Sequence, residues 1–305
     1  MLKVEELFRL WFPFSIPAES RWPFVIMAGY YDESLEGPGF AVAGYLAQYE
    51  VWIYLDWAWQ DLLKKWDIKY FKASECENLL GEFAQYRDNP KDLKSQLKQH
   101  EWEIVKRAKT QFIDAITKHS HGLNGVGAAI VLPDFRKIVS EDSKALHYLT
   151  NNPYYIGLQL SLIAGTIAAA DRNDGKKYKE DHIRIKPIFD SHEDYSSVAK
   201  AVFDQFIIKN PRSARVLLPL DYENDVETSA FQIADTLAYE VRKYLADKLE
   251  KPEKEPRTAF KRLLPTIHKL YRVDYAQLRR IVEKQGTSDL IPIEPEINRP
   301  DPAGF

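Results

Sequence analysis

The stretch Phe24-Val25-Ile26-Met27-Ala28-Gly29-Tyr30-Tyr31-Asp32-Glu33-Ser34 decides the fold class. Its first eight residues are almost all apolar, which is typical of a buried strand. The polar residues 36–39, which include glycine and proline, then indicate a turn. Residues 40–46 form a second apolar run, so the pair predicts a β-hairpin.

Strand-like and helix-like patterns alternate along the rest of the chain, which predicts an α/β fold with a mixed sheet covered by helices on both faces. Further strands are expected at residues 125–132, 183–189 and 216–220, with a short extended piece at 70–75. Helices are expected at residues 51–66, 91–119, 154–170, 196–208 and 228–249. Helix 154–170 is almost wholly apolar, and we expect it in the core and not across a membrane.

Three segments are expected along the chain, with the α/β domain at residues 23–250. Residues 1–22 are predicted to be a packing arm, because their apolar stretch is interrupted by Arg9 and Pro13 and is too short for a signal peptide or membrane span. Residues 251–305 are predicted to be a small helical extension with an irregular, proline-rich tail.

The composition bounds the partners and the location. Apolar residues make up 45% and charged residues 29% of the 305, which is ordinary for a protein with a core. The net charge of −3 leaves contact with nucleic acid to local basic runs, such as residues 106–109, 176–179 and 279–280. The single cysteine, Cys76, excludes an internal disulfide and a thiolate zinc cluster, so we expect a reducing, cytoplasmic location. No membrane partner is expected, because no apolar stretch has the length and continuity of a membrane span.

Three aspartates stand where α/β folds build their sites. Asp32 and Asp190 each follow an apolar strand, and strand ends open onto the crevice in which such folds bind ligands. Asp235 lies at the edge of the apolar face of the predicted helix 228–249. Alternation along the first strand turns Glu33 away from Asp32 unless the chain bends there.

Carboxylates from distant parts of the chain suit a hard divalent cation, Mg²⁺ or Mn²⁺. Two such ions about 4 Å apart can activate a water and stabilise the leaving oxygen of a phosphodiester. The pattern predicts Asp32, Asp190 and Asp235 as metal ligands and catalytic residues, with Glu33 or Glu75 completing the set. The alternative is that these acids are helix caps and turn formers.

Four segments around these residues resemble the bacterial and phage family called domain of unknown function 3800. The segments are Tyr31-Asp32-Glu33-Ser34 with Phe40 and Gly44, like the family's Asp-Glu-Ser motif; Tyr70-Phe71-Lys72-Ala73, like its aromatic-His-Ala segment; Phe189-Asp190, like its strand-terminal aspartate; and residues 231–238, FQIADTLA, like its Gln-(Leu/Ile)-Ala-Asp helix. The last is the most specific, and together the segments span residues 24–243.

The resemblance implies a ribonuclease H-like fold and a metal-dependent nuclease, in which Glu33 joins the three aspartates as a catalytic residue. Gln232 is a second-rank candidate from the same helix motif. Lys72 departs from the family pattern, where histidine is frequent, so the activity is altered or the lysine contacts a phosphate. Phage defence or a mobile element is the expected setting.

Other motifs narrow the function further. His192, two residues after Asp190, is a second-rank candidate for metal binding or proton transfer. The chain has no Gly-x-x-x-x-Gly-Lys phosphate loop, no Gly-x-Ser-x-Gly elbow and no His-Glu-x-x-His zinc helix. Three functions stay open: a nuclease acting on DNA or RNA, a non-catalytic binding module on the same fold, and a phosphatase-like hydrolase of small molecules.

Overall fold

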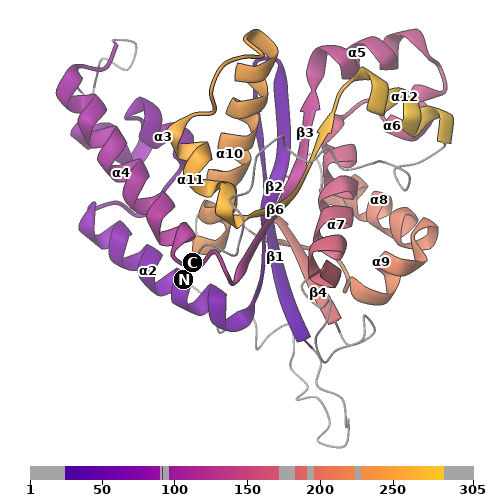
Figure 1. Ribbon diagram of the computed structural model, residues 1–305, viewed down its shortest axis with the longest axis horizontal. Helices are drawn as coiled ribbons and strands as arrows, with labels where there is room; N and C mark the ends of the chain where they lie inside the picture. Colours follow the sequence, from indigo (N-terminus) through magenta and orange to yellow (C-terminus); the bar gives the residue numbers. More distant parts are fainter. Residues whose placement is uncertain are drawn as a thin grey trace, which may run out of the picture.

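The protein is an α/β structure in which one mixed sheet lies between two layers of helices (Figure 1). The computed structural model describes residues 25–89, 91, 96–171, 183–190, 196–223 and 228–284, so the predicted arm at residues 1–22 lies outside the described residues. Across the sheet the strand order is β5-β4-β1-β2-β3-β6. The strands are β1 (Val25–Glu36), β2 (Gly39–Gln48), β3 (Leu123–Val131), β4 (Ile183–Asp190), β5 (Asp221–Glu223) and β6 (Ile267–Val273).

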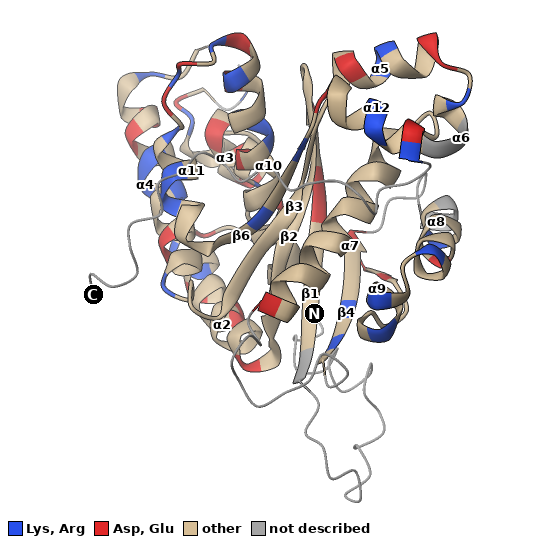
Figure 2. Cartoon of the chain, turned by 45° about the vertical axis from the view of Figure 1, so that its right-hand side comes forward, with Lys and Arg blue, Asp and Glu red and all other residues tan. Residues whose placement is uncertain are grey.

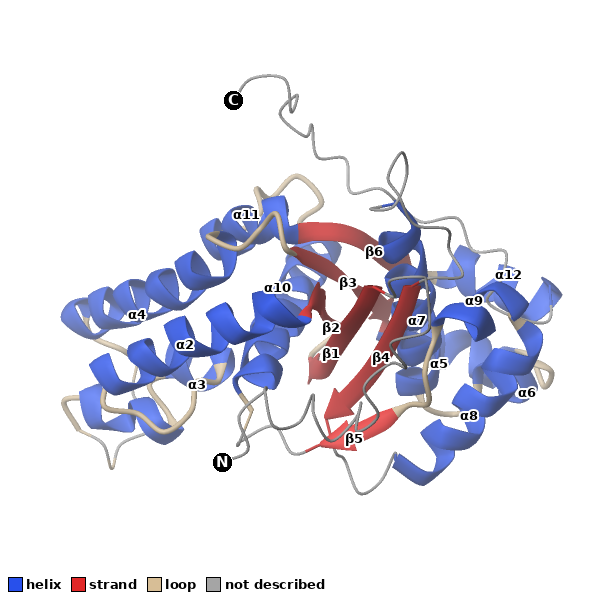
Figure 3. Ribbon diagram, turned by 90° about the horizontal axis from the view of Figure 1, so that it is seen from below, coloured by secondary structure: helices blue, strands red, loops and turns tan. Residues whose placement is uncertain are grey.

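The predicted hairpin of β1 and β2 is confirmed and forms the centre of the sheet. The two strands pair antiparallel from Met27↔Gln48 to Glu36↔Gly39, and Gly37 makes the turn with a φ of +65°. On its other edge β1 pairs parallel with β4, and β4 pairs parallel with β5 (Figure 3). The carboxyl ends of β1, β4 and β5 therefore lie at the same end of the sheet.

Helices cover both faces of the sheet, as the alternation predicts. One layer holds α2 (Tyr49–Lys65), α3 (Ala73–Asn78), α4 (Gln99–Thr117), α10 (Ser229–Glu250) and α11 (Thr258–Leu263), with the short turns η1 (Gly81–Tyr86) and η4 (Leu264–Thr266). The other layer holds α5 (Leu132–Glu141), α6 (Ala145–Leu149), α7 (Pro153–Asp171), α8 (Ser196–Lys209), α9 (Pro211–Val216) and α12 (Tyr275–Lys284). We call these the α10 face and the α7 face.

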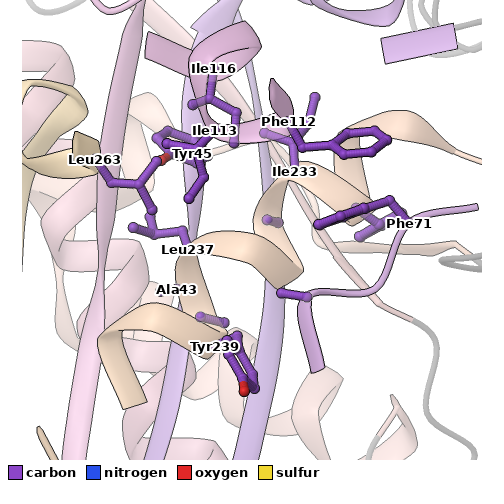
Figure 4. Packing of buried hydrophobic residues seen from close by; sticks show 14 of the residues in the cluster. Ala43, Tyr45, Phe71, Phe112, Ile113, Ile116, Ile233, Leu237, Tyr239 and Leu263 are labelled. Carbon is purple, nitrogen blue, oxygen red and sulfur yellow. The ribbon is translucent and has the colours of Figure 1, made fainter. Parts of the chain in front are cut away.

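On the α10 face, small residues let helix α10 lie close against β1 and β2. Ala234 and Ala238 are one turn apart on α10 and fully buried, as are Ala41 and Ala43 on β2. Larger side chains, among them Tyr45, Phe71, Phe112, Ile113 and Leu237, fill the space around this contact (Figure 4). Close packing of this kind leaves the helix little freedom to slide along the strands.

On the α7 face, the apolar helix α7 packs against β2, β3 and β6. Among the described residues it is the one helix that is long and apolar enough to cross a membrane, by length and composition alone. However, 72% of that stretch is buried inside the protein, which is the core position that the sequence predicts.

The C-terminal part of the chain departs from the predicted helical extension. Strand β6 lies within it and pairs parallel with β3, so this segment contributes an edge strand to the sheet. The strand IHKLYRV mixes basic and apolar residues and is half-buried for most of its length. Edge strands tolerate such polarity because one edge and part of one face meet water, so the apolar signal for a strand is weak.

Three other predicted boundaries are also corrected. The strand predicted at residues 216–220 is replaced by the end of α9 and a single bridge from Leu217 to Ile185, and β5 follows it. The extended piece predicted at residues 70–75 ends at Lys72, where α3 begins. The long helix predicted from residue 91 starts at Gln99, because the Glu101 carboxylate accepts the Lys98 amide at 2.5 Å and caps the helix there.

Gly44 is a site where the fold predicts a large cost of substitution. A Cβ atom there would lie 1.8 Å from the carbonyl oxygen of Tyr30 on the paired strand. Gly44→Ala must therefore push β2 from β1, and we expect a loss of about 3 kcal/mol of unfolding free energy in denaturant titration. Gly39→Ala is the control, because its nearest neighbours would lie at 3.4 Å. Equal midpoints for the two variants would contradict this contact.

Candidate functional site

Helix α10 and strand β1 run side by side in the same direction, and this alignment builds the site. The ring of Phe231 meets that of Tyr30 edge-on, with 5.3 Å between centroids. Further along, the Arg242 guanidinium donates to the Ser34 hydroxyl at 2.8 Å. Asp32 and Asp235 lie between these two contacts, one on each element, so the predicted strand and helix motifs face one another.

Asp32 is a buried carboxylate in an unfavourable electrostatic position. Only 7% of the residue is exposed, and its Oδ1 accepts the amide of Glu33 at 2.7 Å. Burial holds the pKa of Asp32 well above its usual range, and the negative charges of Asp235, Glu33 and Asp190 raise it further. The structure thus brings together the three predicted aspartates, which are up to 203 residues apart in the chain (235 − 32).

Asp190 joins Asp32 through the register of the sheet. Strands β1 and β4 pair in parallel up to Tyr31↔Phe189, so the next position on each strand is an aspartate. Neighbouring strands lie about 4.8 Å apart. Ile188, two residues before Asp190, packs in the core of the α10 face, so alternation puts Asp190 on the face that carries Asp32.

Glu223 extends this row of acids and was missed from the sequence. It pairs with Asp190 in the parallel ladder of β4 and β5 and therefore shares its face. Burial, with the neighbouring charge of Asp221, raises the pKa of Glu223 to about 7, although Lys186 opposes the shift. The signal was an acid following a predicted strand, as at Asp32 and Asp190, but the strand was placed a few residues too early.

Glu33 lies on the opposite face from Asp32, because β1 continues without a bend to Glu36. Tyr31, two residues earlier on the same face of β1, stacks on Phe189 within the core of the α7 face, with 4.7 Å between ring centroids. Tyr222 packs on the same α7 face, where burial raises its pKa and the charge of Glu33 adds a smaller increase. Glu33 acts on Asp32 through its charge and lies apart from the row of aspartates.

Gln232 has a structural role that explains its place in the helix motif. Its Oε1 accepts the indole N–H of Trp59 at 2.9 Å and the amide of Phe71 at 3.0 Å. One turn further along α10, the Oδ2 of Asp235 accepts the amide of Ala73 at 2.9 Å. The two side chains of the Gln-Ile-Ala-Asp motif therefore hold the segment 71–73 against α10.

Lys72 stands between these two anchored amides, beside Asp235. Glu75, by contrast, lies toward η1: its Oε1 accepts the Tyr70 hydroxyl at 3.4 Å, and its carboxylate fills the space above Gly81. Glu75 thus belongs to the α3–η1 corner of the molecule and not to the row of aspartates. His192 lies outside the described residues.

A buried ion network fixes the other end of α3. The Glu77 carboxylate accepts the Lys109 ammonium at 2.6 Å and also the Arg257 guanidinium, and Lys109 pairs with the fully buried Glu240 of α10. Lys109 was assigned from the sequence to an exposed basic run at residues 106–109. The structure corrects this, because Lys109 is 7% exposed and neutralised by two acids.

The donor chemistry suits a divalent cation, although the side chains form no finished coordination shell. Asp32, Asp190 and Asp235 supply carboxylate oxygens, the ligands that Mg²⁺ and Mn²⁺ prefer. In the described part of the chain, no three His, Cys, Asp or Glu side chains converge in an arrangement that could hold a metal. The three carboxylates would have to move closer together to share an ion.

A comparison of the chain with protein-family models finds no match, and neither does a comparison with curated proteins. The resemblance to domain of unknown function 3800 therefore rests on the four sequence segments described above. In the structure two of these segments are in contact, because Gln232 and Asp235 accept hydrogen bonds from the backbone of Phe71 and Ala73.

Removing the Gln232 side chain should detach the 71–73 segment. Gln232→Leu leaves the buried donors of Trp59 and Phe71 without their acceptor, at a cost of about 1–3 kcal/mol for each donor. Gln60→Leu is the matched control, because it removes one partly exposed bond to Ser229. Urea unfolding should show a much larger loss for Gln232→Leu. A loss no greater than that of the control would show that the Gln232 hydrogen bonds contribute little to stability.

The Glu77 network predicts a stability change at acid pH. Burial would raise the pKa of Glu77, but Lys109 and Arg257 outweigh it and lower the pKa from 4.5 to about 2. Because the folded pKa is the lower one, the stabilisation is complete above pH 4.5 and is lost as the pH falls toward 2. The stability gap between wild type and Glu77→Gln should shrink over that window, by on the order of 3 kcal/mol. A gap independent of pH would refute the pairing.

Proposed function

We propose that the protein is a divalent-metal-dependent nuclease, a phosphodiester hydrolase on a ribonuclease H-like fold. The observation that carries the proposal is the buried Asp32 carboxylate, whose ionisation is opposed by burial and by Asp235, Glu33 and Asp190. Folded proteins seldom bury acids together without a cation or proton to offset their repulsion. A divalent cation held by Asp32, Asp190 and Asp235 would relieve it.

The chain's own residues divide the work at such a site. Asp32 and Asp190 come from adjacent parallel strands, which fixes their spacing, and Asp235 approaches from α10 above them. Glu223 is a further acid on the same face, paired with Asp190 in the ladder of β4 and β5. A bound metal would supply an activated water and stabilise the charge that develops on phosphate oxygens.

The fold and the surface charge support nucleic acid as the substrate only in part. The mixed sheet with helices on both faces agrees with the fold that the resemblance implies. Basic and acidic residues are spread over both helical layers of the described chain (Figure 2), and the net charge is −3, so we expect weak electrostatic binding of nucleic acid. The basic run at residues 176–179 lies outside the described residues. Nucleic acid as substrate, phage defence or a mobile element as the setting, and a cytoplasmic location all rest on sequence.

A second candidate is a non-catalytic binding module on the same fold. Two observations favour it: within the described residues no side chains are already arranged to hold a metal, and lysine stands at position 72 where the resembling family often has histidine. Such a module would bind its partner without Mg²⁺ or Mn²⁺, so the dependence on metal separates the two functions.

The cleavage assay that tests the nuclease uses labelled single-stranded, duplex and hybrid substrates with Mg²⁺ or Mn²⁺. We expect metal-dependent cleavage by the wild type, and a loss of at least about a hundredfold in Asp32→Asn and Asp190→Asn. Both changes keep the side-chain shape and remove one charge. Asp61→Asn, an exposed residue on α2, is the matched control and should keep full activity.

Circular dichroism and thermal melting of the same variants show whether they are folded. Folded variants that cleave as fast as the wild type would remove Asp32 and Asp190 from the site. The absence of cleavage on all substrates with either metal would favour the binding module.

A further inference from the structure

Lys72 is held by the same helix that carries Asp235. The amide of the preceding residue, Phe71, donates a hydrogen bond to Gln232. The amide of the following residue, Ala73, donates one to Asp235. Its own backbone is extended, with φ −118° and ψ 126°. The residue on each side of Lys72 is therefore hydrogen-bonded to α10.

The neighbours of Lys72 determine the side from which its ammonium extends. Phe71 is fully buried and stacks on Phe112 with 4.0 Å between centroids, deep in the α10-face core (Figure 4). In an extended segment, successive side chains point to opposite sides. The half-buried Lys72 side chain thus leaves the segment on the side away from the aromatic core, next to the Ala73 amide that Asp235 binds.

Charge gives this placement a chemical meaning. A row of carboxylates repels a phosphodiester, and a fixed cation beside the acids would add to the attraction that a bound metal supplies. Lysine carries a compact point charge on a flexible stem, which suits a phosphate oxygen.

We propose that Lys72 is a substrate-binding residue, whose ammonium contacts a backbone phosphate of the nucleic acid next to the row formed by Asp32, Asp190 and Asp235. This inference rests on the proposed nuclease function and deepens it. It assigns to the lysine a contact with the sugar-phosphate backbone, which carries no sequence information, so Lys72 contributes affinity for any base sequence.

The test measures binding of a labelled oligonucleotide by fluorescence anisotropy over a series of salt concentrations, in the presence of Ca²⁺. Lys72→Ala should weaken binding about tenfold. It should also reduce the slope of log K against log salt by about one, because one phosphate contact is lost. Lys72→Arg keeps the charge and should restore most of the affinity. Lys69→Ala is the control, because Lys69 is an exposed lysine three residues earlier. It should leave the affinity and the salt slope unchanged.

In the cleavage assay, Lys72→Ala should raise KM much more than it lowers kcat, and thermal melting should show a folded protein. If the wild type binds or cleaves nucleic acid while Lys72→Ala keeps its Kd and salt slope, the role of Lys72 is overturned and the nuclease proposal stands. If the wild type neither binds nor cleaves any of the substrates, both proposals fall. A loss of affinity that arginine does not restore would point to packing and overturn the phosphate contact.

Discussion

The close packing of α10 on β1 positions the acids of the candidate site and the segment that lies beside them. Alanines on the helix and on β2 permit the approach, and the contacts of Tyr30 with Phe231 and of Ser34 with Arg242 fix how far the helix lies along the strand. Because this register is fixed at both ends, Asp235 is held over Asp32. The same helix then positions the 71–73 segment through Gln232 and Asp235.

This arrangement places an electrostatic cost inside the fold. Asp32 is buried with like charges around it, and Glu223 extends the row onto β5. Elsewhere the protein pairs its buried charges, as the network of Lys109, Glu77 and Glu240 shows. On one side of α10 the buried Glu77 is neutralised by Lys109 and Arg257, whereas on the other side burial and neighbouring acids hold the pKa of Asp32 above its usual range. This difference is the physical basis for assigning function to the side that carries Asp32. Strain of this kind persists in proteins where a ligand relieves it.

Much of the fold could be predicted because its central elements carry strong local patterns. Three elements have a sequence pattern with a single interpretation: the apolar run before Asp32, the turn at Gly37 and the apolar helix α7. The aspartates Asp32, Asp190 and Asp235 could be selected because each stands at a strand end or at the edge of an apolar helix face. Long-range pairing decided the rest. The mixed edge strand β6 and the three-residue β5, which carries Glu223, become strands through their neighbours and show little pattern of their own.

Isothermal titration of Mn²⁺ into the wild type and into Asp32→Asn tests the central claim most directly, because it needs neither a substrate nor turnover. We expect saturable binding by the wild type and its loss in Asp32→Asn, with Asp61→Asn binding like the wild type. Absence of binding to the wild type, or equal binding by Asp32→Asn, would contradict a cation site built on the α10 face of the strand ends.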